Sequence, residues 1–303
     1  MSFAQFVTFD FVEGNYTLKF TQRSQNKLID TSFSCSNEIN SIIFPNFTAM
    51  DFNIFFTICY FVSKHIKENG GIKTIKRNKI DVDIKDEYTH DFIEVSYSDL
   101  KIFLPQIKNK KRFYKQIYEF SNYKLSNLVL NHIKYKDIKE FNDEGKGEIK
   151  IFQFFDVIIV DNFKEILKLK INPYAYFILS KFNNFMSFDM NEFCSFENKY
   201  TKTLFRLLKQ YENGVSETGA DNLNKKSIYM NKDEFQKFID NSNNYNYNVY
   251  DLEKKTIKPS IKELNLGSYS FKNVDYERIY ADNKNTKMRK VKGFRFIFEK
   301  RND

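Results

Sequence analysis

The chain has 303 residues and a mass of 36.4 kDa, which is long enough for two domains that each bury a core. Its 48 Lys and Arg residues exceed its 39 Asp and Glu residues, so the formal net charge is +9 and a polyanion is a natural partner. The N-terminal sequence lacks a basic segment followed by an apolar core, and no window holds about 18 uninterrupted apolar residues. These features predict a soluble, cytoplasmic protein with no membrane partner.

No pattern in the sequence indicates catalysis, a metal or a cofactor. The three histidines stand alone: His65, His90 and His132. The three cysteines match no metal or redox spacing and are expected to be free thiols: Cys35, Cys59 and Cys194. The glycines around Lys146 lack the spacing of a phosphate-binding loop, and the carboxylates from Asp81 to Glu87 are better interpreted as a solvated strand end than as a Mg²⁺ site. We therefore expect a non-enzymatic protein.

The first half of the sequence predicts an arm followed by a mixed domain. Residues 1–39 form the arm, with a short strand or two. Three helices are predicted, at Phe47–Glu68 with Thr48 as cap, after Glu94–Tyr97 with Ser98-Asp99 as caps, and at Lys108–Leu128. A short strand is expected within Lys73–Ile84, a hairpin or three-stranded meander within His132–Ile171, and a short helix from Asn172-Pro173 to Phe182.

The helix predicted at Lys108–Leu128 has a core-facing set of Phe113, Ile117 and Phe120. Its beginning is rich in cations: Lys108, Lys110, Lys111, Arg112 and Lys115. Because a helix N-terminus already has partial positive charge, five cations there reduce helix stability. Two interpretations remain open, a solvated loop or contact with a phosphate backbone.

The next predicted helix runs from Phe193 to Tyr211 and stops at Asn213-Gly214. Its apolar residues recur at steps of three and four and predict one buried face: Phe193, Phe196, Tyr200, Leu204, Leu207, Leu208 and Tyr211. A second stripe is cationic: Lys199, Lys202, Arg206 and Lys209. We interpret this helix as chiefly structural, with Lys199, Lys202 and Arg206 holding phosphate at most.

A short helix capped by Asn231, with Glu234 completing a capping box, precedes a second basic helical segment. This segment, Tyr250–Leu264, has Ile257, Ile261 and Leu264 on one face. Its other face has lysines at steps of about four residues: Lys254, Lys255, Lys258 and Lys262. Pro259 either kinks this helix or starts its ordered part.

A hairpin is predicted after Gly267, with strands at Tyr269–Val274 and Val291–Phe298 and a polar tip at Ala281–Thr286. Cations cluster near the tip: Lys284, Lys287, Arg289, Lys290 and Lys292. They suit contact with phosphate or a minor groove, and the alternative is a solvated hairpin. Helices followed by a hairpin, twice in tandem, predict an α+β protein of two winged-helix domains, at residues 40–186 and 187–303.

Three segments of the second half resemble iteron-binding plasmid replication initiators. Asn198–Tyr211, with the sequence NKYTKTLFRLLKQY, resembles the helix that begins their C-terminal winged helix. Ile257–Leu264 is similar to their leucine-lysine-proline recognition segment, and Arg289–Phe296 to their basic closing strand. Asn26–Ile29 and Phe47–Asp51 resemble the family's opening motif and first long helix, so that the resemblance covers most of residues 25–300.

The resemblance implies an initiator that binds double-stranded origin repeats, helps to melt an AT-rich region and recruits the host initiator and replicative helicase. It also implies a possible homodimer, since dimers of the family tend to repress and monomers to initiate. The alternative is a winged-helix repressor without a replication role, and a nuclease or relaxase is a third class. The candidate DNA-binding residues are Lys110, Lys111, Arg112, Lys115, Lys199, Lys202, Arg206, Lys254, Lys255, Lys258, Lys262, Lys287, Arg289, Lys290 and Lys292.

Overall fold

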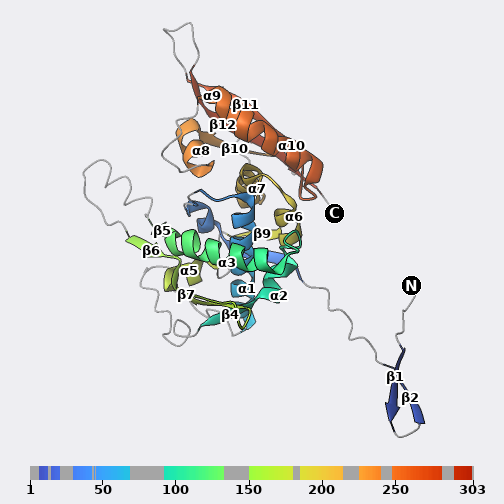
Figure 1. Cartoon of the computed structure of the whole chain (residues 1–303). Coiled ribbons are helices and arrows are strands. Elements are labelled where there is room, and N and C mark those ends of the chain that lie inside the picture. The colour runs from blue at the N-terminus through green and yellow to red at the C-terminus, as the bar shows by residue number, and fades with distance from the viewer. Residues whose placement is uncertain are drawn as a thin grey trace. The chain divides into compact units, whose positions relative to one another are not determined.

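The computed structural model describes residues 7–12, 15–20, 30–42, 44, 46–68, 92–132, 150–179, 185–213, 225–239, 248–281 and 290–301 (Figure 1). The chain divides into two compact units, residues 1–31 and residues 32–303. Within the described part, no helix is both long and apolar enough to cross a membrane.

The N-terminal unit contains an antiparallel hairpin of β1 (Val7–Val12) and β2 (Asn15–Phe20). Residues 32–39, which the sequence assigned to the arm, belong instead to the larger unit. There β3 (Ser32–Ser36) pairs with β9 (Phe185–Asp189), so that the start of the larger unit lies beside a strand from the middle of the chain.

The larger unit contains the same arrangement of elements twice. The first comprises α1 (Ala49–Glu68), β4 (Ile93–Ser96), α2 (Tyr97–Ile102), α3 (Lys110–Tyr123), β7 (Phe155–Asp161) and β8 (Ile166–Ile171). The second comprises α7 (Lys199–Tyr211), β10 (Lys225–Asn231), α8 (Lys232–Ile239), α9 (Val249–Leu252), the π-helical turn η4 (Glu253–Ile257), α10 (Lys258–Gly267), β11 (Phe271–Tyr280) and β12 (Val291–Lys300). Helix, strand, two helical segments and a hairpin follow one another in both.

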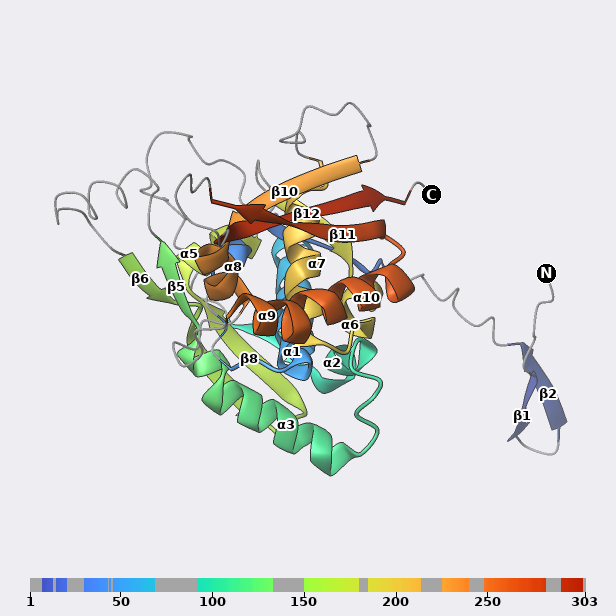
Figure 2. The same cartoon turned by 90° about the horizontal axis from the view of Figure 1, so that it is seen from above.

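The two sheets also have the same strand order. In β4-β8-β7 and in β10-β12-β11, the last strand in sequence lies between the other two, and all pairs are antiparallel. Figure 2 shows α7 to α10 on one face of the second sheet. The ring of Phe235 in α8 packs at a tilt against Phe294 and Phe296 of β12. The repeated order confirms the α+β prediction of two tandem winged helices.

The remaining elements precede the first module, lie within it or connect it to the second. They are the 3-10 helices η1 (Asn37–Ser41) and η3 (Leu125–Asn127), the paired strands β5 (Val129–His132) and β6 (Lys150–Gln153), and the helices α5 (Pro173–Leu179) and α6 (Met190–Ser195). The start of α5 at Pro173 agrees with the prediction. The predicted strand within Lys73–Ile84 lies outside the described residues.

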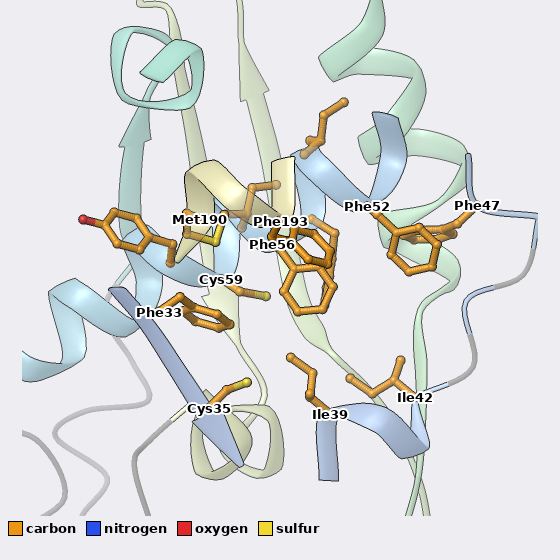
Figure 3. Packing of buried hydrophobic residues seen from close by; sticks show 14 of the residues in the cluster. Phe33, Cys35, Ile39, Ile42, Phe47, Phe52, Phe56, Cys59, Met190 and Phe193 are labelled. Carbon is orange, nitrogen blue, oxygen red and sulfur yellow. The ribbon is translucent and has the colours of Figure 1, made fainter. Parts of the chain in front are cut away.

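The core is built around α1, in which residues 51–60 are all buried. Phenylalanines dominate it because their rings meet edge to face from several elements. Phe56 of α1 lies 4.7 Å from Phe193 of α6 and 6.1 Å from Phe33 of β3, measured between ring centroids (Figure 3). Thr48 caps α1 as predicted, since its Oγ1 accepts from the Asp51 amide at 3.2 Å.

Two local predictions need correction. The helix expected from Phe193 to Tyr211 is two helices, because Asn198 leaves the helical conformation and its side chain caps α7 through the Tyr200 amide at 2.9 Å. Helix α2 is capped by Ser96, which accepts from the Asp99 amide at 3.0 Å, rather than by Ser98 or Asp99.

Candidate nucleic-acid interface

The segment α9–η4–α10 separates apolar from cationic side chains. Leu252, Ile257 and Leu264 are buried against the second module. The exposed side contains all four predicted lysines, Lys254, Lys255, Lys258 and Lys262. Lys255 pairs with Asp251 at 3.2 Å, whereas Lys258 and Lys262 have no ion-pair partner among the described residues. Two uncompensated charges four residues apart on one helix face suit an anionic surface.

Pro259 is the second residue of α10 and follows the π-helical turn. In that turn the Lys258 amide donates to the Glu253 carbonyl, five residues earlier. This wider turn makes room for the proline ring, and the helix can continue although proline has no backbone N–H to donate. The sequence interpretation in which Pro259 starts the ordered helix therefore describes α10, although the preceding lysines are already helical.

Carboxylates and an amide fix α10 in place. Both oxygens of Glu253 accept from Arg278 of β11, each at 2.6 Å. Glu263 accepts from the Glu197 amide at 2.5 Å, just before α7. Asn265 bonds the Val274 backbone through both its donor and its acceptor, at 2.8 and 2.9 Å. The lysine face is thus presented by a helix tied to both α7 and the hairpin.

The hairpin β11–β12 places further cations at the end of the second module where η4 lies. Arg278, bound to Glu253, lies opposite Phe294, two residues beyond the exposed Lys292. Lys290 is also exposed, and its carbonyl accepts from the Ala281 amide at 2.9 Å. Lys284, Lys287 and Arg289 lie outside the described residues. The predicted wing thus begins beside the turn that contains Lys254 and Lys255.

Helix α3 provides a second cationic surface in the first module. Asn109 caps it through the Arg112 amide at 2.9 Å, so the loop interpretation is wrong for Lys110, Lys111, Arg112 and Lys115, which lie on a helix. It holds for Lys108, which precedes the cap. Lys110 pairs with Glu165, which raises the pKa of Lys110, and Lys115 pairs with Glu119 at 3.6 Å. Lys111 and Arg112 are exposed without an ion pair among the described residues. Figures 1 and 2 together show α3 and α9–α10 on the same side of the larger unit.

Contacts of Lys202 and Arg206 with the phosphate backbone of DNA are a wrong prediction, because both side chains are buried away from the protein surface. Helix α7 contacts β9, α1 and η1 on one side and α8, β10 and α10 on the other, which leaves little of it to solvent. Lys202 donates through Nζ to the Phe193 carbonyl at 2.5 Å, and burial lowers the pKa of Lys202 to about 8. Lys199 is partly exposed, with Nζ 4.9 Å from the Tyr200 ring centroid.

Residues that position the interface were missed from the sequence. Glu192 of α6 is buried and accepts from Ser268 Oγ at 2.6 Å, the Ser270 amide at 2.9 Å and Ser270 Oγ at 2.5 Å. It thereby holds the connection between α10 and β11. The only sequence signal was a glutamate inside an apolar helical segment, since its partners lie more than seventy residues away. No metal-binding cluster of His, Cys, Asp or Glu occurs among the described residues.

Comparison with known proteins agrees with this architecture. Residues 32–209 match the profile of the first winged helix (WH1) of initiator replication proteins, and residues 231–298 match that of the second winged helix (WH2) of initiator Rep proteins. The chain belongs to the initiator Rep protein family. Both profiles are winged helices, as the repeated sheet order requires, and the first extends through α7.

A solved structure supports the fold of this initiator independently. The Pi initiator protein, whose crystal structure contains iteron DNA, matches 90% of this chain with 98% of its own, at 14% identity and a TM-score of 0.54. At this identity the likeness is one of fold. None of the curated proteins compared with the chain matches it.

Proposed function

We propose that this replication initiator binds repeated sites of double-stranded origin DNA, with α9–α10 in a major groove and α3 in the adjacent one. The observation that carries the proposal is the pair Lys258 and Lys262, exposed and without ion pairs among the described residues, on a helix anchored at both ends. Lys254 and Lys255 extend that face. Lys290 and Lys292, with Lys287 and Arg289 beyond the described part, contact the phosphate backbone from the wing.

The first module contributes Lys111 and Arg112, together with Lys110 and Lys115, which exchange their carboxylate partners for phosphate on binding. Exposed ion pairs contribute only about 0–1 kcal/mol, so this exchange costs little. The Pi protein, solved with iteron DNA, has the same fold over nearly its whole length, which supports repeated sites as the target.

Initiation proceeds by melting of an AT-rich segment and recruitment of the host initiator and replicative helicase. A homodimer represses the initiator's own gene, whereas the monomer starts replication. These functions rest on membership of the initiator Rep protein family. A transcriptional repressor without a replication role is the alternative function.

Three experiments test the proposal. Footprinting on the DNA that flanks the gene should show protection at regularly spaced repeats, and a plasmid with that DNA as its origin should be maintained only when the protein is supplied. Replication without the protein excludes initiation and leaves the repressor function. Incubation with supercoiled origin DNA and Mg²⁺ should give no nicking, and a covalent adduct on the DNA would identify a nuclease instead.

A further inference from the structure

A pocket of about 410 Å³ lies where the first winged helix meets α7 and α8, and none of its described lining residues belongs to α10. Its apolar wall includes Phe44, Phe52 and Phe238. Its cationic groups are Arg206 and Lys199 of α7 and Lys237 of α8. No acidic side chain is among the described residues that line it, so this part of the lining combines cationic groups with aromatic walls. This volume lies within the range of small-molecule sites in proteins.

Arg206 is the unusual member of this pocket. Its guanidinium carbon lies 4.9 Å from the ring centroid of Phe44, 5.3 Å from that of Phe52 and 5.9 Å from that of Phe238. The residue is only 1% exposed, yet its Nε and Nη1 have no hydrogen-bond partner among the described residues. Aromatic faces stabilise the cation but accept none of its in-plane hydrogen bonds.

A buried cation normally has an anionic or hydrogen-bonding partner. The described part of the chain supplies no carboxylate within ion-pair distance of Arg206, because none of its ion pairs includes this residue. Burial lowers the pKa of Arg206 to about 9, so the group is still charged at neutral pH. Water could fill hydrogen bonds at Arg206, but only an anion also compensates its charge.

We propose that this pocket binds a small organic anion, a carboxylate or a phosphate monoester on an apolar ring. The charged group meets Arg206, the ring packs against Phe44, Phe52 and Phe238, and Lys199 and Lys237 add charge around it. Asn40 Oδ1, also buried without a partner among the described residues, accepts a hydroxyl or a water that accompanies the ligand. Because the walls come from both winged helices, an occupied pocket holds the two modules together.

Binding is tested on the full chain by calorimetry and thermal unfolding. Phenyl phosphate and phenylacetate are the probes that distinguish the two charged groups, and inorganic phosphate and benzyl alcohol are the controls for charge alone and ring alone. At least one probe anion should bind saturably with a dissociation constant below about 10 mM and raise Tm. Both controls should bind at least about tenfold more weakly, since each lacks half of the recognition.

Variants locate the binding. Lys237→Gln should weaken the bound anion about threefold and Phe238→Ala about tenfold, whereas Lys232→Gln on the same helix, outside the pocket, should leave affinity unchanged. Arg206→Lys should abolish binding, and if this variant does not fold, the other two carry the test. Absence of saturable binding by both anions overturns the proposal. So does equal binding of benzyl alcohol, or affinity unaffected by both Lys237→Gln and Phe238→Ala.

Discussion

The carboxylate of Glu253 and the guanidinium of Arg278 form two parallel hydrogen bonds of 2.6 Å each, from Nε and Nη2. Glu253 is 2% exposed and lies in the π-helical turn before α10, whereas Arg278 is 43% exposed and lies on the wing. A bidentate pair has a fixed geometry, unlike a single contact between flexible side chains. This pair therefore sets the position of the wing relative to the helix that we propose to read DNA.

Arg278→Met should destabilise the fold by about 3 kcal/mol, because it leaves the buried Glu253 carboxylate without its cation. The matched control is Lys272→Met on the same strand, whose partner Glu299 lies 3.9 Å away in an exposed pair. This control should cost about 0–1 kcal/mol. Urea unfolding of both variants gives the two free energies, and equal losses would show that the bidentate pair has no special role.

Lys258→Ala and Lys262→Ala should each weaken binding to origin repeats. If the side chain contacts phosphate, the magnitude of the slope of log K against log salt should decrease by about one. If it contacts a base, discrimination between bases at the contacted DNA position should decrease by about 1–3 kcal/mol. Titrations of specific and random duplexes over a range of salt concentrations separate the two cases.

The control for these variants is Lys64→Ala, which removes the same charge from an exposed position on α1. It should leave the salt slope and the specific affinity within error of wild type. If Lys258→Ala and Lys262→Ala behave like Lys64→Ala, α10 is not the recognition helix.

The sequence predicted those features of the fold that depend on local patterns. Thr48, Asn231 and Pro173 mark helix starts through capping and the fixed φ of proline, and all three starts agree with the structure. The cationic face of α10 was predicted for the same reason, since residues four apart share a helix face whatever the rest of the chain does.

Features that depend on distant packing were not predictable. The stripe of Lys202 and Arg206 suggested a solvent-exposed face, because an isolated amphipathic helix has one buried side. Helix α7 instead packs against elements of both modules and is buried on two sides. The partners of Glu192 and Glu253 are brought close only by the tertiary fold. The pocket at Arg206 is likewise lined by segments that lie far apart in the sequence.

Lys202→Met should remove a pH dependence of stability without changing the affinity for DNA. Burial lowers the pKa of Lys202 from 10.5 to about 8, so between these values the native state has lost a proton that the unfolded chain still binds. The free energy of unfolding therefore rises with pH across this window, by on the order of 3 kcal/mol at most, and the full cost of the buried charge is present below pH 8.

The measurement is urea unfolding at a series of pH values, compared as the difference between variant and wild type. Lys64→Met, at an exposed position of α1, is the control and should follow the wild-type profile. A wild-type rise that persists in Lys202→Met would assign the pH dependence to another group. If Lys202→Met reduced the salt slope of DNA binding, Lys202 would contact phosphate despite its burial.

Gly293→Ala should displace β10 from the second sheet. A Cβ at Gly293 would lie 2.8 Å from the Asn231 Cα and closer still to the Met230 carbonyl oxygen, and both obstacles are backbone atoms of the paired strand. Backbone cannot move aside as a flexible side chain does, so a loss of about 3 kcal/mol or more is expected. Gly267→Ala is the matched control, since among the described residues its Cβ would meet only Phe196, at 3.9 Å, and a helical alanine is favoured over glycine by roughly 0.5–1 kcal/mol. Urea unfolding should therefore separate the two variants by several kcal/mol, and hydrogen exchange should show lost protection at β10 amides in Gly293→Ala alone. Equal stability of the two variants would mean that β10 does not pair with β12 at Gly293.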